Sequence, residues 1–173
     1  MSANNSQQPG RPVSASRSEM TELVLPNDTN PLGVLLGGRL MHWIDLAAAL
    51  AAHRHSNSHA VTASMDHIDF VAPISMGDFV ILKSSVNRAF KSSMEVGVKA
   101  FAENYTTGVV QHVASAYLTF VAIDKERKPV VVPPIIPETS EDKRRYEDAL
   151  ARREASLAAR KRAKLRAERE LAR

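Results

Sequence analysis

Residues 27–45 contain the groups with the clearest chemical potential in the chain. Gly37 and Gly38 stand directly before a helical pattern, and glycines at a helix start leave the backbone N–H groups unobstructed. These N–H groups carry the positive end of the helix dipole, so they suit a carbonyl oxygen or a developing oxyanion. A glycine-rich helix start without any ligand is the competing interpretation.

Asp45 and Asn30 are the side chains that such a site would use. Asp45 lies seven residues after Gly38, about two helical turns further on, on the face shared with Met41 and Ala48. A carboxylate there can act as a general base toward water or as a nucleophile on a carbonyl carbon, although a partly exposed helical aspartate fits the same spacing. The Asn30 amide suits the orientation of a water or a substrate carbonyl, and a turn role fits equally well.

The elements that must position these residues follow from the apolar pattern. Residues 39–55 lack Pro and Gly and align Leu40, Ile44, Ala47 and Ala51 on one stripe, which predicts a helix. Alternating and β-branched runs predict five strands, at residues 19–25, 60–72, 79–90, 93–104 and 109–123. Strands of this length predict an α+β fold in which a curved antiparallel sheet wraps around one central helix. The sheet surface that one helix leaves uncovered predicts at least a dimer.

Composition divides the chain into three parts. Residues 1–18 are polar and are expected to form a flexible N-terminal arm, because they bury too little apolar surface to offset the entropy of ordering. Residues 19–137 form the sheet domain and end in a proline-rich strap, residues 129–137, expected to lie extended on the surface. Residues 138–173 begin with a capping sequence and are rich in helix formers, which predicts a long, mostly solvated, charged C-terminal helix.

Composition also excludes several kinds of protein. The 173 residues are 44% hydrophobic and 24% charged, a balance typical of a globular domain with one appendage. The absence of cysteine excludes disulfides, thiolate metal sites and cysteine nucleophiles. No stretch has the length and hydrophobicity of a membrane span, and no signal-peptide pattern stands at the start, which predicts a cytoplasmic protein.

The formal charge of +4 comes from the C-terminal part of the chain. Residues 1–137 carry 11 basic and 11 acidic side chains, whereas residues 138–173 carry 12 and 8. The basic run 160–166 raises an alternative class of function, a non-catalytic module that binds nucleic acid or an anionic membrane. The weak apolar face of this run, and a body without an aromatic and basic surface, argue against nucleic-acid binding.

Several motifs resemble one protein family, in the same order along the chain. The pattern N-D-T-N-P-x-G-x-x-x-G-G-x-L-M-x-W-x-D occupies residues 27–45, and Val-Thr-Ala-Ser-Met-Asp follows at 61–66. Lys-Ser-Ser-Met-Glu-Val at 91–96 and Ala-Ser-Ala-Tyr-Leu-Thr-Phe-Val at 114–121 match as well. Over residues 19–150 the chain is similar to the hotdog-fold acyl-CoA thioesterases of the cytosolic acyl-CoA hydrolase type.

This resemblance implies a hotdog fold that hydrolyses acyl-CoA to a free fatty acid and coenzyme A, without a metal or another cofactor. It also implies a dimer, often assembled into a homohexamer as a trimer of dimers, with the thioester at the dimer interface. Asp45 of one subunit would activate water or attack the thioester. Asn30 of the other subunit would position water or substrate, and the Gly38 N–H would polarise the thioester carbonyl. A hydratase or dehydratase of the same fold is the alternative, although no histidine aligns obviously with Asp45.

Coenzyme A carries phosphates and an amide arm, so basic and small polar residues are expected at the mouth of the site. The candidates for binding it are Gly37, Arg54, Arg88, Lys91, Ser92 and Ser93. A solvated hairpin turn explains Arg88 and Lys91 equally well. His53, His55 and His59 lack the spacing of metal ligands, and solvated histidines near the helix end are expected instead.

Overall fold

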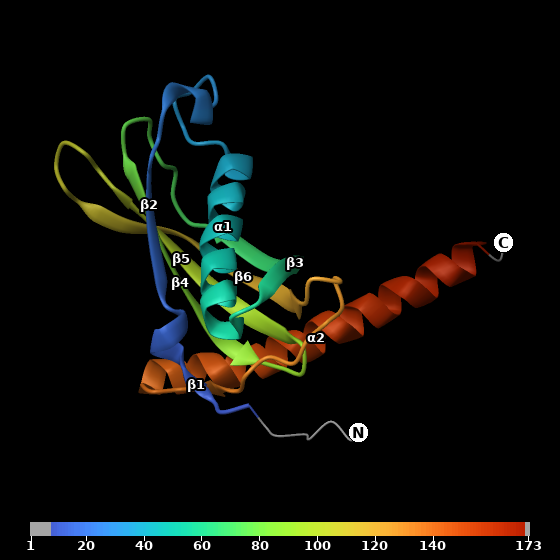
Figure 1. Ribbon diagram of the computed structural model, residues 1–173. Coiled ribbons are helices and arrows are strands. Elements are labelled where there is room, and N and C mark those ends of the chain that lie inside the picture. The colour runs from blue at the N-terminus through green and yellow to red at the C-terminus, as the bar shows by residue number, and fades with distance from the viewer. Residues whose placement is uncertain (1–7, 172–173) are drawn as a thin grey trace, which may run out of the picture.

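The computed structural model describes residues 8–171, in which a five-stranded antiparallel sheet lies between two helices (Figure 1). Residues 1–7 of the expected arm and residues 172–173 of the expected tail lie outside this range. In chain order the strands of this sheet are β2 (Ser18–Leu23), β3 (His59–Phe70), β4 (Phe79–Ala89), β5 (Ser93–Glu103) and β6 (Val110–Ile123). The strand order is β2-β4-β5-β6-β3, with every neighbouring pair antiparallel. The α+β hotdog class expected from the sequence is confirmed, and each strand boundary lies within two residues of its prediction.

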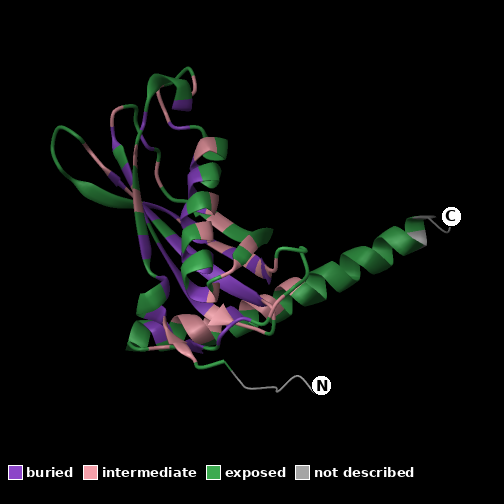
Figure 2. Cartoon of the chain, viewed as in Figure 1, coloured by how far each residue is buried: buried purple, intermediate pink, exposed green. Residues whose placement is uncertain are grey.

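Helix α1 (Gly37–Ser56) packs on the inner face of the sheet, against β3, β4, β5 and β6. Its contact surface is made of small residues: Ala47, Ala48 and Ala51 are at most 1% exposed, beside a fully buried Ile44. The Ser84 hydroxyl of β4 donates to the Ala47 carbonyl at 2.6 Å, so strand and helix backbone lie close together. The short alanine side chains permit this approach and let the sheet wrap the helix (Figure 2).

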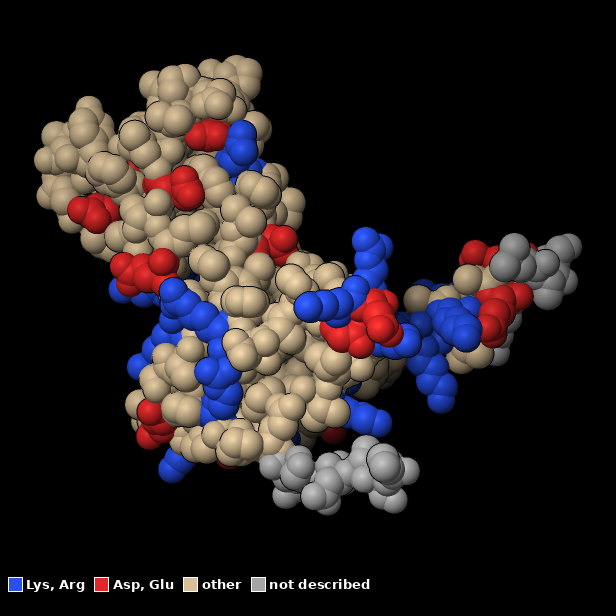
Figure 3. Space-filling model, in the orientation of Figure 1, with Lys and Arg blue, Asp and Glu red and all other residues tan. Residues whose placement is uncertain are grey.

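Helix α2 (Ser140–Leu171) lies across the opposite, outer face of the sheet. Ala149 is fully buried there, and the Arg152 guanidinium makes two hydrogen bonds, of 2.7 and 3.0 Å, to the buried Glu95 carboxylate of β5. The expected long, mostly solvated helix is present, and its first half also packs one side on the sheet. The second half projects beyond the sheet, and Lys and Arg side chains gather along it (Figure 3).

The expectation of a flexible arm is wrong for residues 11–16. Strand β1 (Arg11–Pro12) pairs in parallel with β7 (Ile135–Ile136) in the proline-rich strap. A 3-10 helix, η1 (Val13–Ser16), follows and buries both of its end residues. The Ser16 hydroxyl accepts the backbone N–H of Val86 in β4 at 3.0 Å. Backbone pairing with distant segments thus orders a stretch that has little apolar surface of its own.

His55 joins the C-terminal end of α1 to the strap. Its ring is fully buried, and Nε2 donates to the Pro133 carbonyl at 2.8 Å. Nδ1 is buried without a hydrogen-bond partner among the described residues, so the ring is in the neutral form. Burial lowers the pKa of His55, the Pro133 carbonyl opposes this shift, and the Arg11 guanidinium adds to it. The expectation of a solvated histidine is wrong here.

Acidification is expected to destabilise the fold through His55. The unfolded imidazole titrates near 6.5 and the folded one lower, so the unfolded state takes up more protons and stability falls as pH drops below about 6.5. The His55→Gln variant should lose this dependence between pH 7.5 and 5.5 in urea unfolding, whereas the exposed His53→Gln should retain it. A His55→Gln variant with the full wild-type loss would contradict the assignment.

Candidate active site

At the start of α1, backbone N–H groups without a hydrogen-bond partner among residues 8–171 point toward an open surface. The capping residue Leu36 makes no side-chain cap bond, and the hydrogen bonds of the described chain leave the N–H groups of Gly37 and Gly38 unused. A Cβ atom built on Gly38 would meet nothing within 4 Å. The predicted donor site at the helix N-terminus is therefore open in a single chain, and its groups are the kind that stabilise an oxyanion.

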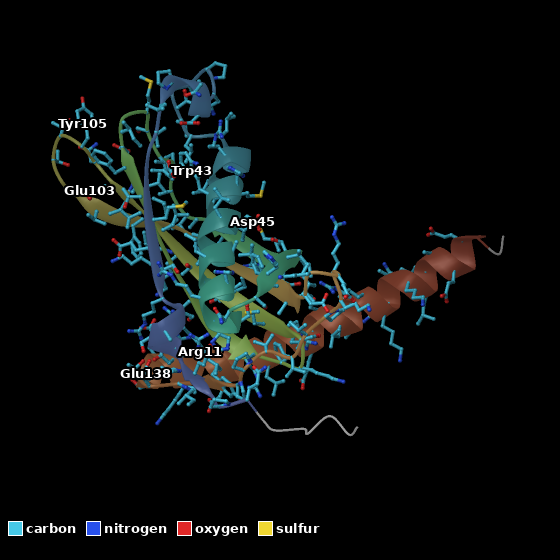
Figure 4. The ribbon with its side chains drawn as sticks, viewed as in Figure 1. Arg11, Trp43, Asp45, Glu103, Tyr105 and Glu138 are labelled. Carbon is cyan, nitrogen blue, oxygen red and sulfur yellow. The ribbon has the colours of Figure 1, made fainter. Side chains whose placement is uncertain are left out.

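Asp45 lies midway along α1, on the side that faces β3 (Figure 4). Its carboxylate is half-buried, and Oδ1 accepts a 2.6 Å hydrogen bond from the Thr62 hydroxyl of β3. This bond fixes the carboxylate and leaves Oδ2 available for reaction. Thr62 was not among the predicted site residues, although it lies in the motif at residues 61–66 that carries part of the family resemblance.

Asn30 lies in the loop between the 3-10 helix η2 (Pro26–Asp28) and α1. Its side-chain oxygen accepts the N–H groups of Leu32 at 2.9 Å and Val34 at 3.2 Å, so the turn role considered above is present. The Nδ2 group donates no hydrogen bond within the described chain. Its orientation is thus fixed while its donor stays free.

The remaining candidates for binding coenzyme A lie elsewhere. They are Arg54 near the end of α1, Arg88 in β4, and Lys91, Ser92 and Ser93 in and beside the β4–β5 turn. Arg54 donates to the Arg17 carbonyl at 2.6 Å. The Arg88 guanidinium lies 3.9 Å from the centre of the Tyr146 ring, and Ser93 accepts a hydrogen bond from α2. Within the described chain, these candidate residues for binding coenzyme A therefore do not gather around Gly38.

A cavity of about 720 Å³ lies on the outer face of the sheet, beside the first turns of α2. Asn87 and Tyr117 are among its lining residues, but Asp45, Asn30 and Gly38 are not. Within residues 8–171 no three His, Asp or Glu side chains gather as metal ligands, and no helix is long and apolar enough to cross a membrane. The candidate site is the open surface of α1 rather than this cavity, because only α1 combines free donors with a held carboxylate.

A sheet wrapped around a helix that begins in two glycines and carries this aspartate is characteristic of one class of protein. Residues 32–109 match the model of the thioesterase superfamily. The acyl-CoA thioester hydrolase YkhA of Bacillus subtilis is 46% identical over 127 residues, which are 73% of this chain and 74% of that protein. The chain belongs to this superfamily, among its hotdog-fold acyl-CoA thioester hydrolases. It also matches mouse acyl-coenzyme A thioesterase 11, at 39% identity over 84% of the chain, and spans 25% of that longer protein.

Solved structures agree with this family. An acyl-CoA hydrolase of Staphylococcus aureus, bound to butyryl coenzyme A and coenzyme A, has a TM-score of 0.87 and 38% identity, over 95% of this chain and 100% of its own. Its solved variants include alanine replacements of one asparagine, one aspartate and one threonine. A hexameric acyl-CoA thioesterase has a TM-score of 0.84 and 43% identity, over 90% of this chain and 98% of its own.

The Gly38→Ala variant is expected to be at least as stable as the wild type, with a gain of about 0.5 kcal/mol, because alanine favours a helix and the Cβ atom meets no neighbour. Gly33→Ala is the matched control, and it should lose about 1 kcal/mol because Gly33 has a φ of +72°. Urea unfolding measures both. A clear loss of stability for Gly38→Ala would show that the space beside Gly38 is not open.

Proposed function

We propose that this protein hydrolyses acyl-CoA thioesters to a free fatty acid and coenzyme A, at a site shared by two copies of the chain. The distance between Gly38 and Asp45 is the observation on which the proposal rests. Both lie on one face of α1, about 10 Å apart along its axis. A reacting carbonyl group must lie about 3 Å from both its donor and its attacking group. A donor and a carboxylate that lie about 10 Å apart along one helix are poorly placed to act on the same carbonyl group, which favours a carboxylate supplied by a second copy.

The chain has a surface on which a second copy can bind. Strand β3 is an edge of the sheet, and most of its residues are exposed. Apolar side chains beside it are also exposed, among them Val61 and Phe70 of β3 and Leu46 and Leu50 of α1. A long, largely exposed edge strand with apolar neighbours favours pairing with an identical edge. Such pairing would join two sheets into one, and the hexameric relative supports further assembly into a trimer of dimers.

In this arrangement the Gly38 N–H of one copy polarises the thioester carbonyl, and the Nδ2 group of Asn30 positions water or substrate beside it. Asp45 of the second copy either takes a proton from water or attacks the carbonyl carbon itself, while Thr62 holds its other oxygen. In the first route the oxygen of water bonds to the acyl carbon, the C–S bond breaks and the proton taken by Asp45 passes to the thiolate of coenzyme A. In the second route Asp45 displaces the thiolate to form an acyl anhydride, and water then hydrolyses this anhydride to the free acid and supplies the proton of the thiol. Because Asp45 is hydrogen-bonded to a threonine rather than to a histidine, hydrolysis is favoured over the hydratase alternative.

The comparisons support these roles. In the Staphylococcus aureus hydrolase, the asparagine, aspartate and threonine chosen for replacement are separated by the same intervals as Asn30, Asp45 and Thr62. That hydrolase binds coenzyme A, which supports the same ligand here. Binding of coenzyme A by Gly37, Arg54 and the β4–β5 turn, the cytoplasmic location and the lack of a cofactor stay predictions.

Release of free thiol from a series of acyl-CoA chain lengths tests the activity. We expect Asp45→Ala to lower kcat by about 1,000-fold or more, and Asn30→Ala by about 100-fold, because each removes a group that acts on the reacting carbonyl or water. The matched controls are Asp148→Ala, a partly exposed aspartate of α2, and Asn27→Ala, an exposed asparagine of η2 close to Asn30 in the chain. Wild-type protein that releases no thiol from any acyl-CoA would overturn the proposal.

Mixing subunits tests whether two copies share the site. Co-expressed Asp45→Ala and Asn30→Ala subunits form mixed dimers in which one of the two sites has both residues. With random pairing, about a quarter of the wild-type activity should return, although each variant alone is inactive. A mixture no more active than its parts would place both residues in the same chain's site.

A further inference from the structure

Asp28 is a buried carboxylate, 5% exposed, at the foot of the loop that carries Asn30. Its Oδ2 accepts the Leu25 N–H at 3.1 Å, and its Oδ1 is 2.8 Å from Nε of Arg39 in the first turn of α1. The backbone carbonyl of Asp28 also accepts the Leu36 N–H at 2.9 Å. One residue thus ties both ends of the loop, residues 29–36, to the start of the helix.

The remainder of the loop is held by a different set of bonds. The Asn30 N–H donates to the Val34 carbonyl at 2.9 Å, and the Leu35 N–H donates to the Ile74 carbonyl at the same distance. Asp78, also buried, caps the neighbouring segment by accepting the Ser75 N–H. These bonds fix the internal shape of the loop. The bonds of Asp28 link the beginning of the loop directly to the start of α1.

Arg39 occupies a position that a helix by itself disfavours. The positive end of the helix dipole repels a cation in the first turn, and this first turn contains no acidic residue. Asp28 neutralises Arg39, so the pair adds little net charge beside the donors of Gly37 and Gly38. An ion pair with a buried carboxylate is also weak evidence of added stability, because desolvation of the carboxylate offsets the attraction between the charges. The pair is therefore better explained by the position in which it holds the loop than by added charge at the helix start or by added stability of the fold.

We infer that Asp28 and Arg39 are positioning residues, which set the place of the Asn30 amide relative to the Gly37 and Gly38 N–H donors. This inference rests on the proposed function, since it assigns the pair to the half of the site that binds the thioester carbonyl. Neither side chain touches the substrate. They act by keeping two donors, one on a loop and one on a helix, at a fixed spacing around the reacting carbonyl group.

Steady-state hydrolysis of acyl-CoA by Asp28→Asn, Arg39→Gln and the double variant tests the pair. Asp28→Asn removes the charge at constant shape, and Arg39→Gln removes the charge and shortens the side chain but keeps an N–H donor near the position of Nε. We expect kcat to fall between about 10- and 100-fold in each single variant, with KM within about twofold, because a displacement of about 1 Å costs this much. The double variant should fall no further than the single ones, since either change breaks the same bond. Arg39→Lys, which keeps the charge, should recover part of the loss.

Lys128→Gln is the matched control, because it breaks an exposed ion pair with Glu126 far from the loop and should leave kcat unchanged. Thermal unfolding of every variant distinguishes a displaced Asn30 amide from a loss of folded protein. Variants that melt earlier but keep the wild-type kcat would overturn the inference and leave the pair a structural one, as would additive losses in the double variant. Absence of thiol release from the wild type would instead overturn the proposed function.

Discussion

The contact between the alanine face of α1 and the inner face of the sheet is the constraint on which the rest of the structure depends. Ala47, Ala48 and Ala51 leave no bulk between helix and strands, so the sheet closes around α1 and fixes its axis. Because α1 is held along its length, its residues keep fixed positions relative to one another. The distance between Gly38 and Asp45 is then fixed, and this distance favours a site built from two chains.

The two faces of the sheet serve different purposes. The inner face holds α1 and, through Thr62, orients the carboxylate of Asp45. The outer face is covered by the first half of α2, where Arg152 both pairs with Glu95 and lies 3.8 Å from the centre of the Tyr117 ring. This outer layer is polar and well paired, yet it contributes no group to the proposed reaction. With α1 on the inner face and α2 on the outer face, the edge strand β3 stays available to a second copy.

The sequence predicted those elements whose signal is local. Strand alternation and the uninterrupted pattern before His55 place each boundary of the sheet, and the start of α1, within about two residues. The failures have a common cause. Residues 11–16 and the ring of His55 are ordered by partners far away in the chain, such as Ile135 and Pro133, and the packing of α2 on Glu95 of the sheet is a contact of the same kind. Periodicity and composition carry no information about such partners.

The sequence alone determined the residue types and their spacing: two glycines at a helix start, an aspartate two turns later and an asparagine in the preceding loop. It thereby determined the class of fold and, through its resemblance, the kind of reaction to expect. The tertiary structure decided which groups are free and which are held. It left the glycine N–H donors open, bonded Asp45 to Thr62, and placed Asp28 against Arg39, because the partner in each bond is supplied by the packing of a separate loop, helix or strand.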